Sequence, residues 1–493
     1  MSPDAPRRPT RPPSRITARP AGGPVACSFA QERLWFLDRL VPGSSSYNTD
    51  VAVRFPAPCD LEALRLALNG IVARHEALRT TFMEVDGRPY QVIAEGLVLD
   101  LPLIELAGSD AAPAMAEARR IAAAHTAAAF DLASGPMLRP LALRFAGGEV
   151  VLVVAMHHIV TDGWSMRVFL DELRRLYDAA RSSLPSPLAP LPIQYADYAV
   201  WQRQRLGETR LATELSWWAE TLAELPTIEL PCDHPRPARG SFRGASHHLS
   251  LPPGVADALR GLARSERATM FMALLAGFVG LLARYGAGDD IVVGTPVAGR
   301  PRTELEGLIG FFVNTLVLRC DAGDDPTFRQ LLARVRSVTL DAFAHQELPF
   351  EKLVEELQPQ RDLSRNPLFQ VMFHHIGHAD PVPAAPSRSR SVISDRDTAA
   401  FDLSVNVWES PSGLRARFEY ATDLFEAPTI ARMATHYRRL LTAAAAQPDL
   451  PLSALGMLEE AETEELLQAA RGPSVEVPPL CVHELVDATA AAC

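Results

Sequence analysis

The stretch of the sequence best suited to catalysis is a ten-residue segment that ends a strongly apolar run. It covers residues 156–165 and reads MHHIVTDGWS. His157 and His158 follow the apolar residues 150–156, which are typical of a buried strand. A histidine at the mouth of such a strand is partly desolvated, which favours the neutral imidazole. Because a neutral imidazole can accept a proton near physiological pH, the segment predicts a general base.

The residues around the two histidines have separate expected roles. Side chains alternate along a strand, so His157 and His158 should point in opposite directions, one to the interior and one to a cavity. Asp162 is expected in the following turn, where its carboxylate can bond backbone amides or pair with a buried arginine. Gly163 would let the backbone pass close to the histidine, and a helix should begin near Ser165.

Other kinds of site have less support in the sequence. The histidine pairs at 247–248 and 374–375 lack the following xxxDG and are interpreted as packing or surface residues. There is no HExxH and no Cys/His cluster, and a single HxxxD is a poor zinc site, so no metal is expected. The absence of G-x-S-x-G, GxGxxG and P-loop motifs argues against a covalent acyl-enzyme and a nucleotide cofactor.

Composition narrows the possible partners of the 493-residue chain. A hydrophobic share of 47% and a charged share of 22% are ordinary for a globular protein. The formal net charge of −11 argues against non-specific electrostatic binding to nucleic acid. No apolar run is long enough to span a membrane, and no signal peptide follows the first residue. Six scattered cysteines without a CxxC pair predict reduced thiols and a cytoplasmic location.

The order of patterns along the chain predicts two α/β halves with a cleft between them. Residues 1–24, with seven prolines and five arginines, are expected to form a disordered leader. Residues 25–190 alternate strand-like and helical patterns, and residues 191–457 repeat this alternation after the proline-rich stretch 185–192. Residues 380–396 are expected to form an exposed excursion, and residues 458–493 a linker with a short tail.

The segment HHIVTDG resembles the HHxxxDG signature of the condensation domains of nonribosomal peptide synthetases, which share a fold with chloramphenicol acetyltransferase. Six further segments match the other motifs of that family, in the same order. They are residues 28–37 (SFAQERLWFL), 74–82 (RHEALRTTF), 195–201 (YADYAVW), 309–319 (IGFFVNTLVLR), 345–353 (HQELPFEKL) and 361–370 (RDLSRNPLFQ). The motifs span roughly residues 25–455. Related families fit less well: plant-type acyltransferases also carry DFGWG, which is absent here, and heterocyclising relatives replace the paired histidines with aspartates. Epimerising relatives keep HHxxxDG but differ in the flanking motifs.

This resemblance implies an α/β fold of two chloramphenicol-acetyltransferase-like lobes that form a V-shaped pseudo-dimer with a central tunnel. It also implies an amide-forming acyltransferase acting between an upstream donor and a downstream acceptor peptidyl carrier protein. Each carrier would present its substrate as a thioester on a phosphopantetheine arm, so that no cofactor is bound covalently to this chain. The acceptor amine would attack the donor thioester carbonyl. The flanking motifs favour the type that joins an L-configured donor to an L-aminoacyl acceptor.

The resemblance also assigns roles to individual residues. His158 matches the cavity-facing histidine, expected either to act as a general base or to orient the amine and stabilise the tetrahedral species. His157 matches the first histidine, which is usually structural. Asp162 is expected to pair with Arg300, in the segment GTPVAGR that matches the floor of the tunnel. Gly163 would offer space near the reacting carbonyl, and could also offer an amide there.

Four other residues of the motifs have less specific expected roles. Asn314 either lines the tunnel or caps a turn, while Trp35, Trp201 and Phe311 are interpreted as core.

Residues 481–490 resemble the opening of an adenylation domain, so the chain is either a stand-alone condensation protein or a piece of a larger synthetase. Two other functions stay open. One is a stand-alone acyltransferase that releases the chain onto a free amine or alcohol, and the other is a non-catalytic recruitment module.

Overall fold

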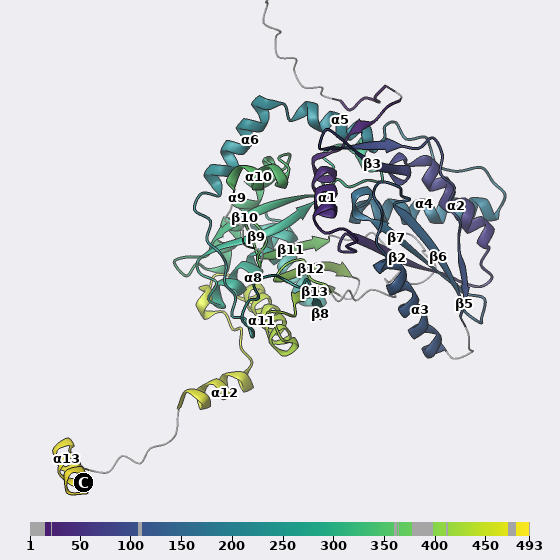
Figure 1. Cartoon of the computed structure of the whole chain (residues 1–493). Coiled ribbons are helices and arrows are strands. Elements are labelled where there is room, and N and C mark those ends of the chain that lie inside the picture. The colour runs from purple at the N-terminus through teal and green to yellow at the C-terminus, as the bar shows by residue number, and fades with distance from the viewer. Residues whose placement is uncertain are drawn as a thin grey trace, which may run out of the picture.

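The computed structural model describes residues 15–20, 22–106, 111–358, 362, 364–376, 398–410, 413–471 and 480–492. The described chain folds into two α/β lobes that lie side by side, with helix α1 (Phe29–Leu40) between them (Figure 1). Helix α1 is joined to the second lobe by an ion pair of 3.2 Å between Arg33 and Glu351. The exposed excursion predicted at residues 380–396 lies outside the described residues.

The first lobe is built on a mixed sheet whose second strand ends at His157, and His158 follows it directly. In this sheet β2 (Asn48–Phe55), β7 (Val150–His157), β6 (Leu138–Arg144) and β5 (Leu103–Glu105) lie in that order. All eight residues of β7 are buried, as its continuous apolar sequence predicts. The helices of the lobe are α2 (Leu61–Arg74), α3 (Ala111–Ala127) and α4 (Gly163–Arg181), and a smaller sheet contains β1 (Val25–Ala26), β4 (Arg88–Ile93) and β3 (Thr80–Val85).

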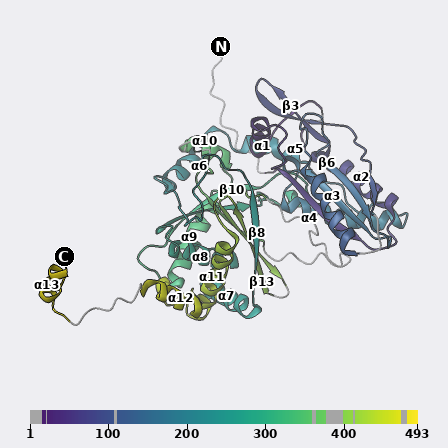
Figure 2. The same ribbon diagram turned by 60° about the horizontal axis from the view of Figure 1, so that its bottom comes forward.

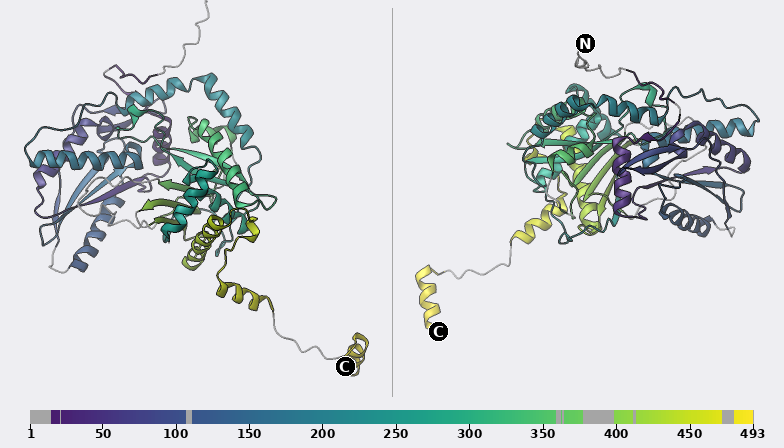
Figure 3. Two further views of the ribbon diagram at one scale, coloured as in Figure 1. Left: turned by 180° about the vertical axis from the view of Figure 1, so that it is seen from behind. Right: turned by 45° about the horizontal axis from the view of Figure 1, so that its top comes forward.

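The second lobe contains a wider sheet packed against long helices, as the second and third views show (Figures 2 and 3). Its strands lie in the order β10 (Asn314–Asp321), β9 (Asp290–Val297), β11 (Val371–Ile376), β12 (Leu403–Ser410), β13 (Gly413–Ala421) and β8 (Gly244–Leu251). Its helices are α6 (Glu208–Thr221), α7 (Pro253–Ser265), α8 (Met270–Arg284), α9 (Phe328–Ala344), α10 (Phe350–Leu357) and α11 (Ala427–Ala446). The apolar helix α8 lies at the centre of this core, and eleven of its residues are buried.

The segment between β9 and β10, here called the crossing segment (residues 299–312), leaves its own lobe and completes the core of the other. Leu305, Leu308, Ile309 and Phe312 are buried in the hydrophobic cluster of the first lobe. Helix α5 (Tyr195–Arg205) packs into the same cluster. The predicted boundary at 190/191 therefore differs from the packing, because elements that follow it in the chain belong to the first core.

The predicted disordered leader is wrong for its last part. Residues 15–20 and 22–24 lie within the described chain, and Ile16 is 3% exposed in the core of the first lobe. The guanidinium of Arg19 forms ion pairs with Asp197 at 2.9 Å and with Glu76 at 2.7 Å. One buried apolar side chain and two ion pairs attach this stretch to α5 and to the residues after α2, despite its proline-rich composition.

The C-terminal part contains the helices α12 (Glu460–Arg471) and α13 (Val482–Ala492), and none of their described residues is buried. His436 of α11 contacts Glu462 of α12, with 2.7 Å between the ring Nε2 and the carboxylate. Among the described residues no single helix has the length and hydropathy to cross a membrane. Helices α7 and α8 would meet that test only together, and they are bent by 105° at their junction.

Candidate active site

The two histidines at the end of β7 face different surroundings. His157 is 2% exposed, and its ring packs near the rings of Tyr47 and Phe130, with centroids 6.5 and 6.0 Å away. Its Nδ1 accepts a hydrogen bond of 3.2 Å from the backbone N–H of Ile159. Burial, with a smaller contribution from the neighbouring His158, lowers the pKa of His157 to about 3. His157 is therefore a neutral core residue that shapes the turn.

His158 is half-buried and is held in one tautomer by the backbone. Its N–H donates to the carbonyl oxygen of Tyr47 at 2.8 Å, which fixes the main chain. Its ring Nδ1 lies 3.1 Å from the carbonyl oxygen of Thr161. A carbonyl oxygen only accepts, so Nδ1 carries a proton, and in the neutral ring Nε2 is the acceptor nitrogen. This arrangement suits an imidazole that takes up a proton at Nε2.

Asp162 caps helix α4 and joins the two lobes. Its Oδ1 accepts a hydrogen bond of 2.7 Å from the backbone N–H of Ser165, so the helix begins at Gly163, two residues before the predicted start. Its Oδ2 accepts 3.0 Å from the N–H of Phe312 in the crossing segment. The guanidinium of Arg300 lies 3.3 and 3.5 Å from the two carboxylate oxygens. The predicted Asp162–Arg300 pair is thus present in the structure.

Arg300 is enclosed by the segment that it organises. Its side chain is 1% exposed, and its Nη1 donates to the carbonyl oxygens of Leu305 and, at 2.8 Å, Leu308. The guanidinium carbon lies 3.9 Å from the centroid of the Phe312 ring, a cation–π distance. Burial lowers the pKa of Arg300, and the carboxylate of Asp162 opposes that shift. Asp162 is therefore the carboxylate that compensates the buried charge of Arg300.

The hydroxyl of Ser165 joins Asp162 and Arg300 in this cluster. The sequence analysis gave this hydroxyl no role. It donates to the carbonyl oxygen of Gly310 at 2.7 Å and accepts from the N–H of Gly310 at 3.1 Å. It also accepts 2.7 Å from the guanidinium of Arg300. Gly310 is required here, because an added Cβ would lie 2.0 Å from the ring of Tyr195. Ser165 is the last letter of the segment MHHIVTDGWS, which was the available signal.

Two further side chains, those of Tyr195 and His75, also hold the crossing segment. The hydroxyl of Tyr195 donates to the carbonyl oxygen of Phe311 at 2.6 Å, and the Ser28 hydroxyl lies 2.8 Å from the same phenol. His75 accepts 3.2 Å from the N–H of Ile309 at Nδ1, so its Nε2 donates to a carboxylate oxygen of Glu172 at 2.8 Å. These residues belong to other motif segments, and nothing in their spacing points to a common target.

Phe311 is the residue of the crossing segment that lies beside His158. The two ring centroids are 5.9 Å apart, with an angle of 58° between the ring planes. The Phe311 side chain is half-buried, whereas the prediction placed it in the core with Trp201, which is 6% exposed. Trp35 is also half-buried. One of the three predicted core aromatics is therefore a neighbour of the proposed base.

The remaining predicted site residues are Gly163 and Asn314. Gly163 is exposed, and a Cβ added there would meet no atom within 4 Å, so this position borders open space. Asn314 donates from Nδ2 to the carbonyl oxygens of Gln346 and Leu348 at 3.0 and 2.6 Å. Its Oδ1 accepts 3.0 Å from the N–H of Phe350 at the start of α10. These bonds correspond to the capping role that was left open for Asn314.

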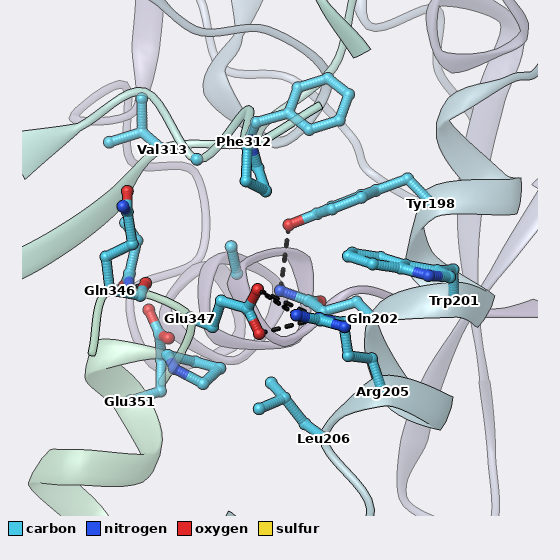
Figure 4. A pocket seen from close by; sticks show the side chains of 15 residues that line it. Tyr198, Trp201, Gln202, Arg205, Leu206, Phe312, Val313, Gln346, Glu347 and Glu351 are labelled. Atoms are coloured by element: carbon cyan, nitrogen blue, oxygen red, sulfur yellow. Dashed lines mark hydrogen bonds and ion pairs between the residues drawn. The ribbon is translucent and has the colours of Figure 1, made fainter. Parts of the chain in front are cut away.

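Asn314 also lines a pocket on the Phe312 side of the crossing segment, with an empty volume of about 590 Å³. Figure 4 shows α5 residues on one side of this pocket and the residues before α10 on the other. Arg205 of α5 donates to the Glu347 carboxylate from Nε, at 2.8 and 3.0 Å, and from Nη2, at 2.8 Å. The ion pair ties α5 to the loop that Asn314 organises.

Among the described residues no group of three or more metal-ligating side chains is present.

Comparison with known proteins identifies the family. The family model named "Condensation domain" matches residues 23–467 of the chain. The chain belongs to the condensation-domain family. A linear gramicidin synthase protein of Brevibacillus parabrevis is 45% identical over 469 residues, which cover 94% of this condensation domain and 6% of that protein. Phosphinothricin tripeptide synthetase PhsC of Streptomyces viridochromogenes is 42% identical over 448 residues, which are 90% of the domain and 41% of PhsC.

Solved structures confirm the predicted α/β fold of the condensation domain. The X-domain from teicoplanin biosynthesis matches with a TM-score of 0.80 and 30% identity, over 90% of this chain and all of that one. The first condensation domain of the calcium-dependent antibiotic synthetase, in complex with a substrate analogue, matches with a TM-score of 0.74 and 23% identity, over 89% and 99%. The condensation domain spans only 6–9% of the linear gramicidin synthase proteins that it matches.

Proposed function

We propose that this condensation domain forms an amide bond between two carrier-bound substrates in nonribosomal peptide synthesis. The observation that supports the proposal is the tautomer of His158. The bond from Nδ1 to the carbonyl oxygen of Thr161 makes Nε2 the acceptor atom of a half-buried imidazole. The crossing segment beside this ring is held by the buried cluster of Asp162, Ser165 and Arg300.

The reaction needs one nucleophilic attack and one proton transfer. The acceptor amine attacks the carbonyl carbon of the donor thioester while its proton passes to Nε2 of His158. The C–S bond then breaks, the sulfur takes the proton back from the imidazolium, and the new amide stays on the acceptor arm. Such proton transfer contributes about 10²–10⁴-fold. Holding two tethered substrates together contributes as much as about 7–11 kcal/mol.

The partners in this proposal are an upstream donor and a downstream acceptor peptidyl carrier protein, with phosphopantetheine arms that enter a tunnel between the lobes from opposite mouths. An adjacent adenylation domain is proposed on the likeness of residues 481–490 to the opening of such a domain. The donor and acceptor are proposed to be L-configured, on the flanking motifs. Names of relatives support this setting, since gramicidin and phosphinothricin tripeptide synthetases are peptide-forming assemblies.

The proposal is tested with the purified chain and two carriers, each loaded with an aminoacyl thioester. Mass spectrometry of the acceptor carrier should reveal a dipeptidyl thioester with the wild type and a reaction about 100-fold slower or more with His158→Ala. The matched control is His248→Ala, in the second histidine pair, on the exposed side of β8, which should react at the wild-type rate. Equal rates for wild type and His158→Ala would refute the proposed base.

A recruitment module is the second candidate function. One structural relative at 30% identity, the X-domain from teicoplanin biosynthesis, was solved in complex with OxyB. The intact HHxxxDG segment and the held tautomer of His158 favour catalysis. A wild-type chain that condenses no loaded pair of carriers, yet forms a stable complex with a protein of the same biosynthetic assembly, would favour recruitment.

A further inference from the structure

Phe311 has a backbone fixed from three directions and a side chain that lies beside the proposed base. The N–H of Gly310 and the N–H of Phe312, on either side of it, bond to Ser165 and Asp162 at 3.1 and 3.0 Å. Its own carbonyl accepts 2.6 Å from the phenol of Tyr195, a fully buried residue. Because the main chain is held so firmly, the place of the Phe311 ring beside His158 is a property of the fold.

The Phe311 ring lies at the distance from the imidazole at which the side chain of an attacking amine would begin. A nitrogen that gives a proton to Nε2 of His158 lies about 2.6–3.2 Å from it. The α-carbon follows about 1.46 Å further on, and the first side-chain atom one bond beyond that. The side chain of the acceptor therefore begins roughly 4–6 Å from the imidazole, whereas the Phe311 centroid is 5.9 Å from the imidazole centroid.

The turn that holds Nδ1 of His158 contains a residue that takes up no such space. Gly163, two residues after the Thr161 carbonyl that binds Nδ1, has no side chain, and a Cβ there would meet nothing within 4 Å. Phe311 is thus a bulky, half-buried group that lies against the imidazole while its backbone cannot shift away.

We propose that Phe311 is a specificity-determining residue that limits the size of the acceptor side chain. The inference rests on the proposed function, because it takes the acceptor amine to approach Nε2 of His158. A smaller residue at position 311 would admit larger acceptor side chains, and a larger residue would restrict the site to small ones. Phe311 takes no part in proton transfer, so its effect on the reaction is purely steric.

The experiment uses the full chain and one donor carrier, with acceptor carriers loaded with glycine, alanine, leucine, phenylalanine or tryptophan. Single-turnover rates are measured for wild type, Phe311→Leu, Phe311→Ala and Phe311→Trp. Relative to wild type, Phe311→Ala should raise the ratio of the tryptophan rate to the alanine rate at least tenfold, and Phe311→Trp should lower it. Because each ratio is taken within one protein, a partial loss of folding cancels.

The matched control is Phe242→Ala, which removes a 61% exposed phenylalanine ahead of β8 and should leave every ratio unchanged. If wild type condenses the carriers and the Phe311 variants keep its ratios, the inference is wrong while the proposed function stands. If wild type forms no condensed product with any pair, the proposed function fails, and the inference fails with it.

Discussion

The carboxylate of Asp162 accepts a hydrogen bond of 3.0 Å from the backbone N–H of Phe312, 150 residues further along the chain. This bond connects the turn after the histidine strand in the first lobe with the crossing segment that comes from the second. The buried carboxylate of Asp162 therefore helps to fix the base and the surface beside it relative to each other. Most of the expected behaviour of variants follows from this connection.

Asp162→Asn should reduce the free energy of unfolding by about 3–5 kcal/mol, because it leaves the 1% exposed guanidinium of Arg300 without its counter-charge. Urea unfolding followed by circular dichroism measures the loss. Asp171→Asn is the matched control on the same helix, since its pairs with Arg174 and Arg175 are exposed and worth about 0–1 kcal/mol. Equal losses for both variants would contradict the role given to Asp162.

His158→Gln and His158→Asn should both condense about as slowly as His158→Ala, because an amide cannot take up the proton. Gln can place an amide near the Nε2 position, and Asn can place one near Nδ1, where Thr161 accepts. Single-turnover rates with loaded carriers measure the effect, and thermal unfolding should show wild-type stability. If His158→Gln keeps more than a tenth of the wild-type rate, His158 orients the amine and is no base.

The stability of the domain should fall in acid partly through His157. The pKa of His157 is lowered to about 3 by burial, whereas an unfolded histidine takes up its proton near pH 6.5. Between these values the unfolded state binds more protons, so stability decreases as the pH falls from 6.5 towards 3.

The test of this pH dependence compares wild type with His157→Asn, whose side-chain oxygen can still accept from the N–H of Ile159. Between about pH 6.5 and pH 4, wild type should lose about 3 kcal/mol more than the variant, at about 1.36 kcal/mol for each pH unit. Denaturant titrations at several pH values give both curves. Parallel curves would show that His157 titrates normally in the folded protein.

Asn314→Ala should destabilise the domain by about 2–3 kcal/mol, since it leaves two carbonyl oxygens and the Phe350 N–H without their partner. The loop before α10 should also become more accessible to amide exchange, measured by hydrogen–deuterium exchange. Asn366→Ala is the control, because that side chain bonds the Ala400 carbonyl at the protein surface. An Asn314→Ala variant as stable as the control would contradict this role.

The local elements around the site were predictable because each depends on neighbouring residues. Eight consecutive buried residues end at His157, and Asp162 supplies the cap three residues before Ser165. The pair of Asp162 with Arg300 followed from the resemblance to the family. Family, α/β fold and amide-forming class were likewise available from the ordered motifs, and the comparisons confirm the first two.

The contacts that fix Phe311 were not predictable, because they form between segments that meet only after folding. Tyr195 and Phe311 are 116 residues apart, and Ser165 and Gly310 are 145 apart. In the sequence each is an ordinary aromatic, hydroxyl or glycine. The packing of Ile16 was missed for a similar reason. The proline-rich composition of residues 1–24 predicts disorder, and nothing in the local sequence indicates that this one apolar side chain packs into the core of the first lobe.

The crossing segment has a consequence for building hybrid synthetases. By composition the proline-rich stretch at 185–192 is the natural place to join halves of two such domains, yet residues 299–312 return to complete the first lobe. A hybrid joined there would take the equivalent of His158 from one parent. It would take the equivalents of Arg300, Gly310 and Phe311 from the other parent. An exchange that keeps each imidazole beside its own Phe311 equivalent must therefore transfer the histidine segment (residues 156–165) together with the crossing segment (residues 299–312).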